Sequence, residues 1–297
     1  MKTAVLTMAY KSYRFLEKWV DYYGGLFGRE NLFVVSHGND DKHREIGEGC
    51  NVLTVPRVFS EDFDVIRWGA LSEISSGLTS FYDVVICGDC DELITTDPRC
   101  GLSLPEYLAQ TDASLTVPLG LHLLPRTAQG ESAFANWDLP LLRQSQFAII
   151  DGAYCKPSIL KQRRRFTAGG HEGVGELLPI DLNLVLFHLK YLDPERLELA
   201  HSLGQDVRQT AQQIADEGRE IGAWPMSSVW RQGKAAEQEF LDRMQSASCI
   251  ERSDPILFAY RFLMKNARTD EEGTRSYRIP MRNPRKIRVP RRFVTVF

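Results

Sequence analysis

Apolar and polar positions along the first 110 residues predict short buried strands that alternate with amphipathic helices. Continuous apolar runs predict strands, because a strand covered on both faces is apolar throughout. These runs are residues 3–8, 32–35, 52–55 and 82–88. Apolar side chains at helical spacing predict two helices, over 12–27, closed by Gly24-Gly25, and over 63–78. This order predicts an α/β fold with a mostly parallel, nucleotide-binding (Rossmann-like) sheet flanked by helices.

The pattern changes after Pro105, where strand and helix signals are less regular. We expect a short helix followed by three further strands and a glycine-rich, charged loop that suits an active site. The helix is expected over residues 105–110 and the loop over 162–176. The strands are expected over 114–117, 148–153 and 182–189. Two helical stripes follow, formed by Leu197, Ala200, Val207, Ala211 and Ile214, and by Phe240, Leu241 and Met244. The expected organisation is a domain over 1–192, a helical C-terminal extension over 193–272 and a basic tail over 273–297.

The composition is that of a globular protein with a sizeable core. Of the 297 residues, 43% are hydrophobic and 25% are charged, and the net charge of -3 gives no general case for nucleic-acid binding. The N-terminal apolar run is too short for a signal peptide, and no stretch reaches 18 apolar residues. We therefore expect a cytoplasmic protein with reduced cysteines. Cys87-x-x-Cys90 is better explained by packing, because Asp89 and Asp91 disfavour a thiolate at Cys90 and no second cysteine pair exists for zinc.

The most informative motif is Asp89-Cys90-Asp91-Glu92, directly after the fourth apolar run. Ligands of open α/β sheets bind at the carboxyl edge of the strands. Three carboxylates crowded there repel one another unless a cation lies among them, and hard oxygen ligands suit Mg²⁺ or Mn²⁺. The alternative is a polar turn in which an aspartate caps the next helix.

Three segments together resemble one enzyme family. They are Thr7–Lys11 with the helix containing Phe15 and Trp19, the acidic motif itself, and Arg165–Glu172 followed by Phe187-His188-Leu189-Lys190-Tyr191. The chain over residues 1–192 resembles the bacterial family 2 glycosyltransferases of the GT-A fold with a D-x-D-E motif. That branch usually has Asn-Glu where this chain has Tyr10-Lys11.

The resemblance implies metal-dependent transfer of a sugar, with inversion, from a nucleotide diphosphate sugar to a glycan or lipid-linked acceptor. The leaving diphosphate is neutralised in such reactions by a divalent cation, here Mn²⁺ or Mg²⁺. The implied ligands are Asp91 and His188. Asp89 would reach the metal through water or lie near the ribose, and Glu92 would bind the metal, support a ligand or cap a helix.

Donor and acceptor residues are implied in the same way. Asp40 and Asp41 would accept hydrogen bonds from the base or ribose, or else form an Asx-type turn. Arg67 would face the diphosphate, or else lie on a helix surface. Inversion needs a general base for the acceptor hydroxyl, for which Glu172 is the first candidate, beside His171. The other two candidates for the base are Asp151 and Asp181.

Two basic regions have less specific readings. Lys161 and Arg163–Arg165 would bind phosphates or form a solvated face. The tail over 273–297 carries eight lysine and arginine residues with no acidic one. It would contact an anionic membrane at the inner face, pack on the body, remain disordered or bind RNA.

Two other functions use the same residues. A non-catalytic nucleotide-sugar or carbohydrate-binding protein on this fold is the main alternative. A Mg²⁺-dependent phosphohydrolase would also use clustered carboxylates, but its nucleophile, acid and phosphate loop cannot be assembled here.

Overall fold

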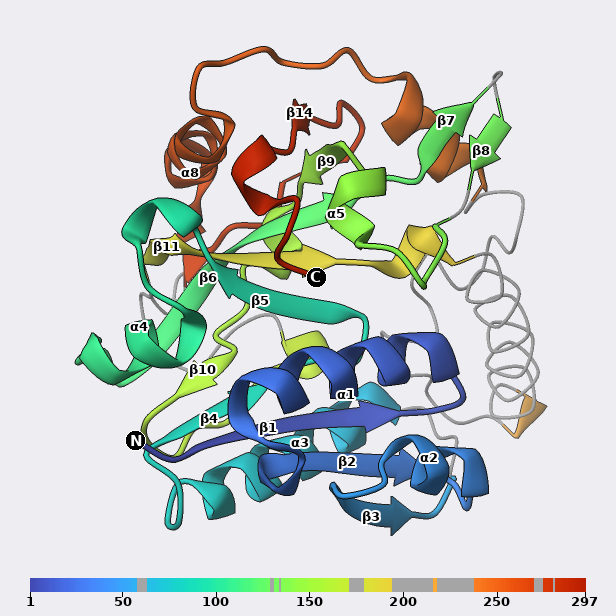
Figure 1. Cartoon of the computed structure of the whole chain (residues 1–297), viewed down its shortest axis with the longest axis vertical. Coiled ribbons are helices and arrows are strands. Elements are labelled where there is room, and N and C mark those ends of the chain that lie inside the picture. Colours follow the sequence, from blue (N-terminus) through green and yellow to red (C-terminus); the bar gives the residue numbers. More distant parts are fainter. Residues whose placement is uncertain are drawn as a thin grey trace.

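The computed structural model describes residues 1–57, 63–128, 131–133, 135–170, 179–193, 216–217, 238–269, 275–279 and 281–297. In this part of the chain, ten strands form one sheet (Figure 1). Eight of them follow the order β14-β9-β6-β10-β4-β1-β2-β3, and β11 joins through β6 and carries β5.

The N-terminal half of the sheet is a parallel, Rossmann-like unit with the order 3-2-1-4. Its strands are β1 (Thr3–Ala9), β2 (Leu32–His37), β3 (Asn51–Val55) and β4 (Val84–Cys87). Every residue of β1 is buried, because the strand is central and has helices on both faces. The predicted α/β class and the four predicted strands are confirmed.

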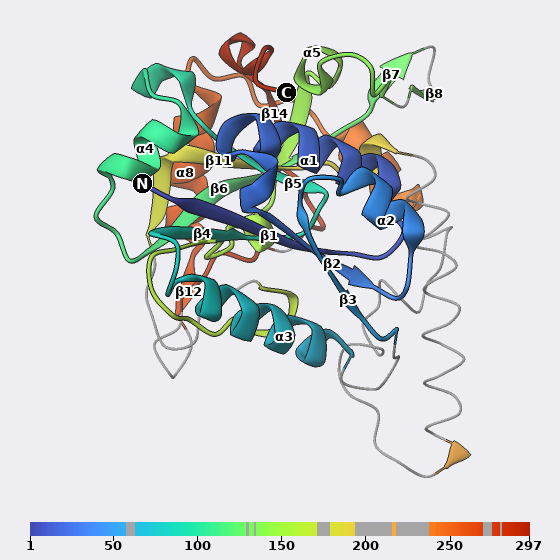
Figure 2. The ribbon, with the colours of Figure 1, turned by 60° about the horizontal axis from the view of Figure 1, so that its bottom comes forward.

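Helices cover both faces of this unit (Figure 2). Helix α1 (Tyr13–Phe27) buries the predicted stripe that includes Phe15, Trp19 and Tyr23. Helix α3 (Phe63–Leu78) packs Trp68 and Leu71 against the opposite face. The predicted helix over 12–27 is confirmed, but Gly24-Gly25 does not close it. Both glycines lie inside the helix, which ends at Phe27 and is followed by Gly28, whose φ of 84° favours glycine.

The C-terminal half of the sheet is mixed. Strand β6 is parallel to β11 and antiparallel to β9 and β10, and β11 is antiparallel to β5. The bounds are β5 (Glu92–Thr96), β6 (Leu115–Leu123), β9 (Phe147–Ile150), β10 (Ile159–Leu160), β11 (Ile180–His188) and β14 (Lys286–Arg288). The strand predicted over 114–117 runs on through Pro118, which lies where the pairing of β6 with β11 is irregular and a backbone donor is dispensable.

The remaining elements are short, except α8. The helices are α2 (Asp41–Ile46), α4 (Leu104–Gln110), α5 (Leu141–Gln144) and α8 (Pro255–Asn266). Two hairpins pair β7 (Arg126–Ala128) with β8 (Glu131–Ala133), and β12 (Arg268–Thr269) with β13 (Arg275–Ser276). Single 3₁₀ turns are η1 (Arg29–Asn31), η2 (Pro98–Cys100), η3 (Gly152–Tyr154), η4 (Ala168–Gly170), η5 (Lys190–Leu192) and η6 (Arg291–Phe293).

Of the two helical stripes predicted in the C-terminal extension, the first lies outside the described residues. The second is helical over residues 238–246, and it buries Leu241 and Met244. Within the part of the chain that the structure describes, no helix is both long enough and apolar enough to cross a bilayer.

The described end of the basic tail is part of the folded body. Strand β14 pairs antiparallel with β9, and Ile287 and Phe293 are fully buried in the main core. Figure 1 shows this segment lying along the edge of the sheet near β9. Of the alternatives for the tail, packing on the body describes the position of residues 281–297.

The cysteines are free thiols. Cys87 and Cys90 are both buried, and burial raises the pKa of the Cys87 thiol well above its usual value. Their position agrees with a packing role.

Candidate metal centre and active site

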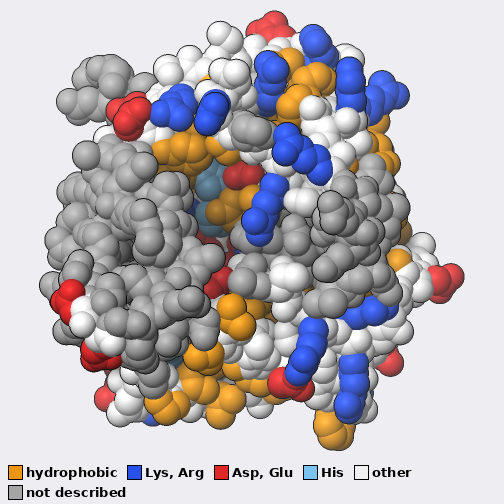
Figure 3. Space-filling model, turned by 180° about the vertical axis from the view of Figure 1, so that it is seen from behind, with side chains coloured by type: hydrophobic (Ala, Val, Ile, Leu, Met, Phe, Trp, Pro, Cys, Tyr) orange, Lys and Arg blue, Asp and Glu red, His pale blue; other side chains and the backbone are white. Residues whose placement is uncertain are grey.

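The acidic motif lies at the carboxyl edge of the parallel strands. Figure 3 shows a hollow in the back face of the molecule, with histidine and acidic side chains on its floor and basic side chains along one edge. Asp89 and Asp91 follow β4 directly, and Glu92 begins β5. The motif therefore turns the chain from one strand into another, and no helix follows for an aspartate to cap.

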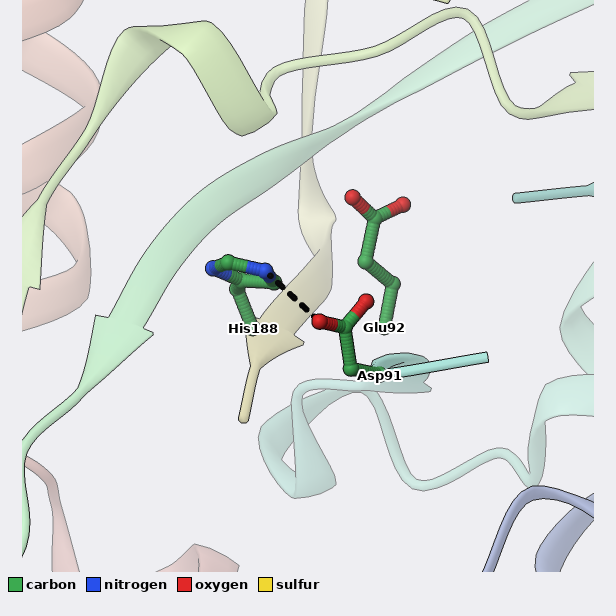
Figure 4. Close-up of side chains that lie close together, drawn as sticks. All are labelled: Asp91, Glu92 and His188. Carbon is green, nitrogen blue, oxygen red and sulfur yellow. Dashed lines mark ion pairs between the residues drawn. The ribbon is translucent and has the colours of Figure 1, made fainter. Parts of the chain in front are cut away.

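Strand pairing brings His188 to the acidic motif. His188 ends β11 opposite Glu92 in the antiparallel pair with β5, and the Leu189 amide donates a 2.8 Å hydrogen bond to the Asp91 carbonyl. Asp91 and His188 point toward each other, with Glu92 beside them (Figure 4). The His188 Nε2 and Asp91 Oδ2 atoms are 3.3 Å apart. All three side chains are buried, and their ligand atoms lie within 4.8 Å of one another.

The three residues fit a divalent cation. Mg²⁺ holds its ligands at about 2.1 Å in octahedral geometry, which places neighbouring ligand atoms about 3 Å apart. The separation of 3.3 Å between Asp91 and His188 is close to that value, and a Glu92 oxygen lies within 4.8 Å of both ligand atoms. Carboxylate oxygens with one neutral imidazole suit Mn²⁺ or Mg²⁺. Burial lowers the pKa of His188, which favours the neutral ring.

Asp89 lies beside these three residues but is held by two cations. Arg67 donates to its Oδ1 atom, and the Lys156 Nζ atom lies 3.1 Å from Oδ2. Burial opposes ionisation of Asp89, but Arg67 and Lys156 outweigh it and hold its pKa well below the usual range. Arg67 also lies 3.7 Å from Asp64. The predicted diphosphate-binding arginine therefore does reach the acidic motif, and the predicted ligand Asp89 contacts cations in this structure.

Lys156 is a site residue that the sequence did not indicate. Its side chain is 3% exposed, and its Nζ atom lies 2.5 Å from Glu92 Oε1. Burial opposes its charge, but Glu92 and Asp89 raise its pKa above the usual value, so it remains protonated. Burial raises the pKa of Glu92, as do Asp89 and Asp91, against the opposing effect of Lys156. The segment Tyr154-Cys155-Lys156-Pro157 matches no motif that predicts such a contact.

Counting formal charges gives this cluster a negative excess. Arg67 and Lys156 contact three carboxylates, those of Asp64, Asp89 and Glu92, whereas Asp91 lies against His188. When these carboxylates are ionised, they outnumber the two cations, and a divalent cation would reduce the negative excess. Uncompensated buried charge is strongly destabilising, so this excess supports a cation at Asp91 and His188.

A glycine in β6, Gly120, allows the Tyr154 ring to pack beside His188. A Cβ atom on Gly120 would lie 2.5 Å from the carbonyl carbon of Tyr154 and 2.7 Å from the carbonyl oxygen of Asp151. The absence of a side chain therefore lets η3 approach the sheet. As a result, the Tyr154 ring stacks on His188 with centroids 3.9 Å apart and an angle of 22° between the planes.

The three candidates for the general base differ in position. Asp151 is buried near the cluster, where burial raises its pKa to about 6 against the opposing effects of the Ala153 amide and Lys156. Asp181 accepts a 2.8 Å hydrogen bond from Tyr107 near the start of β11. Seven residues of strand, about 20 Å, separate it from His188, so the two are not brought together. Glu172 and His171 lie outside the described residues.

Asp40 and Asp41 lie at the start of α2, a helix that the sequence analysis missed. Asp40 caps this helix by accepting a 3.0 Å hydrogen bond from the Lys42 amide, and it also accepts from the Tyr13 hydroxyl at 3.0 Å. Asp41 is exposed and pairs with Arg44 at 2.6 Å. The geometry of Asp40 is that of the Asx-type alternative.

A second group of polar residues lies at the same edge of the sheet. The Arg57 guanidinium lies 3.6 Å from the centroid of the Tyr10 ring and donates to His37 Nδ1 at 2.9 Å. Burial, together with Arg57 and Arg67, lowers the pKa of His37 to about 4, so its ring is neutral at pH 7. Lys11 and Ser12 adopt φ values of 51° and 54°, a left-handed conformation that non-glycine residues adopt uncommonly.

The basic residues after β10 face away from the acidic cluster. The Lys161 ammonium donates to the Thr111 carbonyl, Arg163 donates to Ser80 at 3.3 Å, and Arg165 pairs with Glu73 at 3.1 Å. These contacts fix the segment to α3 and to the end of α4, so the structure does not bring it to Asp91.

Comparisons with known proteins find similarity among solved structures alone. No protein-family model matches the chain, and no curated protein matches it. Among solved structures, it is similar to one described as mannose-1-phosphate geranyltransferase from Thermus thermophilus. That likeness has 11% identity and a TM-score of 0.26, and it covers 78% of this chain and 68% of the other.

A second similar structure is described as 4-diphosphocytidyl-2C-methyl-D-erythritol synthase. It has 18% identity and a TM-score of 0.27 over 54% of this chain and 75% of the other. Both TM-scores are low, so the fold assignment rests on the strand order and helix placement described above.

Proposed function

We propose that this protein is a metal-dependent glycosyltransferase that transfers a sugar, with inversion, from a nucleotide diphosphate sugar to a glycan or lipid-linked acceptor. The observation that carries this proposal is the buried group of Asp91, Glu92 and His188 at the carboxyl edge of a Rossmann-like sheet. The resemblance of residues 1–192 to family 2 glycosyltransferases supports the same reaction.

The metal would be held by Asp91 and His188, with Glu92 as a further ligand. When bound, Mn²⁺ or Mg²⁺ would act as a Lewis acid toward the diphosphate leaving group. Asp89 would contribute by positioning Arg67 and Lys156, or would reach the metal through water or lie near the ribose. Arg67 and Lys156 would add positive charge on the side where the diphosphate oxygens bind.

The nucleotide would lie over the ends of β1, β2 and β3. Tyr10, His37 and Arg57 offer flat π-systems and a cation there, which are suited to stacking on a base and to contacting phosphate. Asp40 and Asp41 remain proposed partners for the base or ribose. Asp40 also accepts the capping hydrogen bond from the Lys42 amide.

The acceptor hydroxyl would lose its proton to a carboxylate. Glu172 is the first choice and Asp151 the second, because Asp151 is buried next to the cluster with a pKa of about 6. A base with this pKa is ionised at pH 7 and can accept a proton as the acceptor attacks. Asp181 is the third candidate, and its distance from His188 counts against it.

Two finer points belong to the proposal. A lipid-linked acceptor would place the protein, expected to be cytoplasmic, at the inner membrane face. Contact with anionic lipid would rest on exposed basic side chains such as Arg282 and Arg291, because Ile287 and Phe293 are buried.

The main alternative is a protein that binds nucleotide sugars or carbohydrates without catalysis. Tyr10-Lys11 in place of Asn-Glu favours this alternative, as do the two cations that occupy Asp89. Both functions predict binding of a nucleotide, so turnover separates them.

The test is a thermal-shift screen of nucleoside diphosphates with and without Mn²⁺, followed by hydrolysis assays with the nucleotide sugars of each base that binds. We expect stabilisation that requires nucleotide and Mn²⁺ together, because a ligand that binds only the folded state raises its stability. Slow release of nucleoside diphosphate would support the enzyme. Stabilisation without any hydrolysis or transfer would favour the binding protein, and no stabilisation would contradict both.

A further inference from the structure

His122 and His188 form a buried pair of imidazoles behind the proposed metal site. They are directly opposite each other in the parallel pairing of β6 and β11, and each is 3% exposed. Their two Nδ1 atoms are 2.7 Å apart, which is a hydrogen-bond distance. One Nδ1 must therefore carry a proton and donate the hydrogen bond, and the other must accept that hydrogen bond.

The direction of this hydrogen bond decides what His188 presents to Asp91. If His188 donates from Nδ1, its Nε2 atom carries a lone pair that faces Asp91 Oδ2 at 3.3 Å. Two lone pairs at this distance repel each other unless a cation lies between them. If His122 donates instead, His188 Nε2 carries the proton and donates to Asp91, and no cation can bind to that nitrogen.

The surroundings hold both rings in place. Tyr154 stacks on His188, and Tyr191 packs edge-on against His122 with centroids 4.7 Å apart. Among the described residues, the buried His122 Nε2 atom has no hydrogen-bond partner. An apolar side chain would avoid the cost of this unsatisfied nitrogen, so filling the core does not explain a histidine here. The hydrogen bond that the ring does make, within the described chain, joins its Nδ1 atom to His188 Nδ1.

We propose that His122 is a positioning residue that accepts a hydrogen bond from His188 Nδ1–H and so directs the Nε2 lone pair of His188 toward a divalent cation at Asp91. This role of His122 rests on the proposed function only because it requires a cation bound at Asp91 and His188. Histidine ligands of metals depend on such partners, whose loss typically weakens metal binding 10- to 100-fold.

Two substitutions of His122 that are both amides test the position of the acceptor atom. His122→Asn places an amide oxygen near the position of Nδ1, whereas His122→Gln places it near that of Nε2. We expect His122→Asn to bind Mn²⁺ within a few-fold of the wild type in calorimetry. We expect His122→Gln and His122→Phe to bind it at least tenfold more weakly, at unchanged stoichiometry.

A second readout uses the wild-type protein, so it depends neither on activity nor on the effect of a substitution on the fold. Long-range ¹H–¹⁵N spectra of the wild type with added Mg²⁺ report which nitrogen of His188 is protonated, and His188→Gln assigns the signal. We expect the Nδ1–H form when Mg²⁺ is bound. Protonation of Nε2 in the bound state, or wild-type Mn²⁺ affinity in folded His122→Gln, would overturn the role of His122 and leave the proposed function intact. Absence of Mn²⁺ and Mg²⁺ binding in the wild type would contradict the metal site and this inference together.

Discussion

Arg292 binds the carboxylate of Asp97 through two parallel hydrogen bonds, from Nε to Oδ1 at 2.6 Å and from Nη2 to Oδ2 at 2.7 Å. Asp97 follows β5, and Arg292 belongs to the C-terminal segment, so the pair joins residues far apart in the sequence. Arg99 also contacts Asp97, at 2.8 Å, and the Asp97 side chain is only 2% exposed. Bidentate pairs of this kind are among the stronger polar contacts.

The first prediction concerns stability in acid. Burial opposes ionisation of Asp97, but the hydrogen bonds from Arg292 and Arg99 outweigh it and lower the pKa from 3.8 to about 2. Because the folded-state pKa is the lower one, the stabilisation is present above pH 4 and is lost as the pH falls from about 4 to 2. Arg292→Gln should lower the free energy of unfolding at pH 7 by about 2 kcal/mol, measured by urea denaturation, because Arg99 still pairs with Asp97.

The same substitution should make unfolding less sensitive to pH near 4. Arg291→Gln is the matched control, because Arg291 is the exposed neighbour, and it should change stability by less than about 0.5 kcal/mol. Equal losses in the two variants would show that the contact with Asp97 is not the cause.

The second prediction concerns Asp91 and the metal. Asp91→Asn removes one negative charge without changing the shape of the side chain, so Mn²⁺ affinity measured by calorimetry should fall at least 100-fold. The fold should persist, and transfer should fall by orders of magnitude. Asp112→Asn, at an exposed position, is the control and should bind Mn²⁺ as the wild type does. If Asp91→Asn retains wild-type affinity, the acidic motif is structural.

The third prediction separates Lys156 from the metal ligands. Lys156→Met leaves Asp89 and Glu92 without their shared cation, so the metal-free protein should lose about 3 kcal/mol of stability. Added Mn²⁺ should then raise its melting temperature by more than that of the wild type, because a repelling charge near the site is gone. Lys161→Met should show neither effect. A smaller Mn²⁺ response in Lys156→Met would mean that the lysine supports the metal site.

The fourth prediction distinguishes a base from a ligand. Glu172→Gln should abolish transfer but preserve metal-dependent nucleotide binding, because loss of a general base affects the transition state and not ground-state affinity. His188→Ala should instead weaken metal-dependent nucleotide binding, measured by calorimetry. The reverse result would exchange the two roles. Loss of transfer with preserved nucleotide binding in Asp151→Asn, and not in Glu172→Gln, would move the base to Asp151.

The regular strands and helices were predictable because the local periodicity of apolar residues identifies them. Strand β1 and helix α1 are long enough for their apolar pattern to identify them, and the buried run that became β11 was equally clear. Helix α2 and strand β5 were missed, because each is short and polar at its ends. The two glycines of α1 disfavour helix by about 1 kcal/mol each, but the packing of Trp19 and Tyr23 outweighs that cost.

The candidate site was predictable only where it is continuous in sequence. The acidic motif and His188 have local signals, namely carboxylates after a strand and a histidine that ends one. Lys156 and His122 have none, because long-range strand pairing alone brings them there. His122 lies 66 residues before His188, and no spacing rule connects them until β6 and β11 are known to be neighbours.

Gly120 has a consequence for how mutational data on this protein should be read. A Cβ atom there meets the backbone of η3, and one on Gly152 would clash with the Tyr277 carbonyl oxygen. Neither neighbour is a flexible side-chain tip that could yield. In a saturation scan for activity, these two positions would rank with the acidic motif as intolerant of every replacement, although neither carries a reactive group. Gly25→Ala, in open space on α1, would be tolerated. Intolerance at Gly120 and Gly152 therefore identifies the supports of the active site as readily as its chemistry.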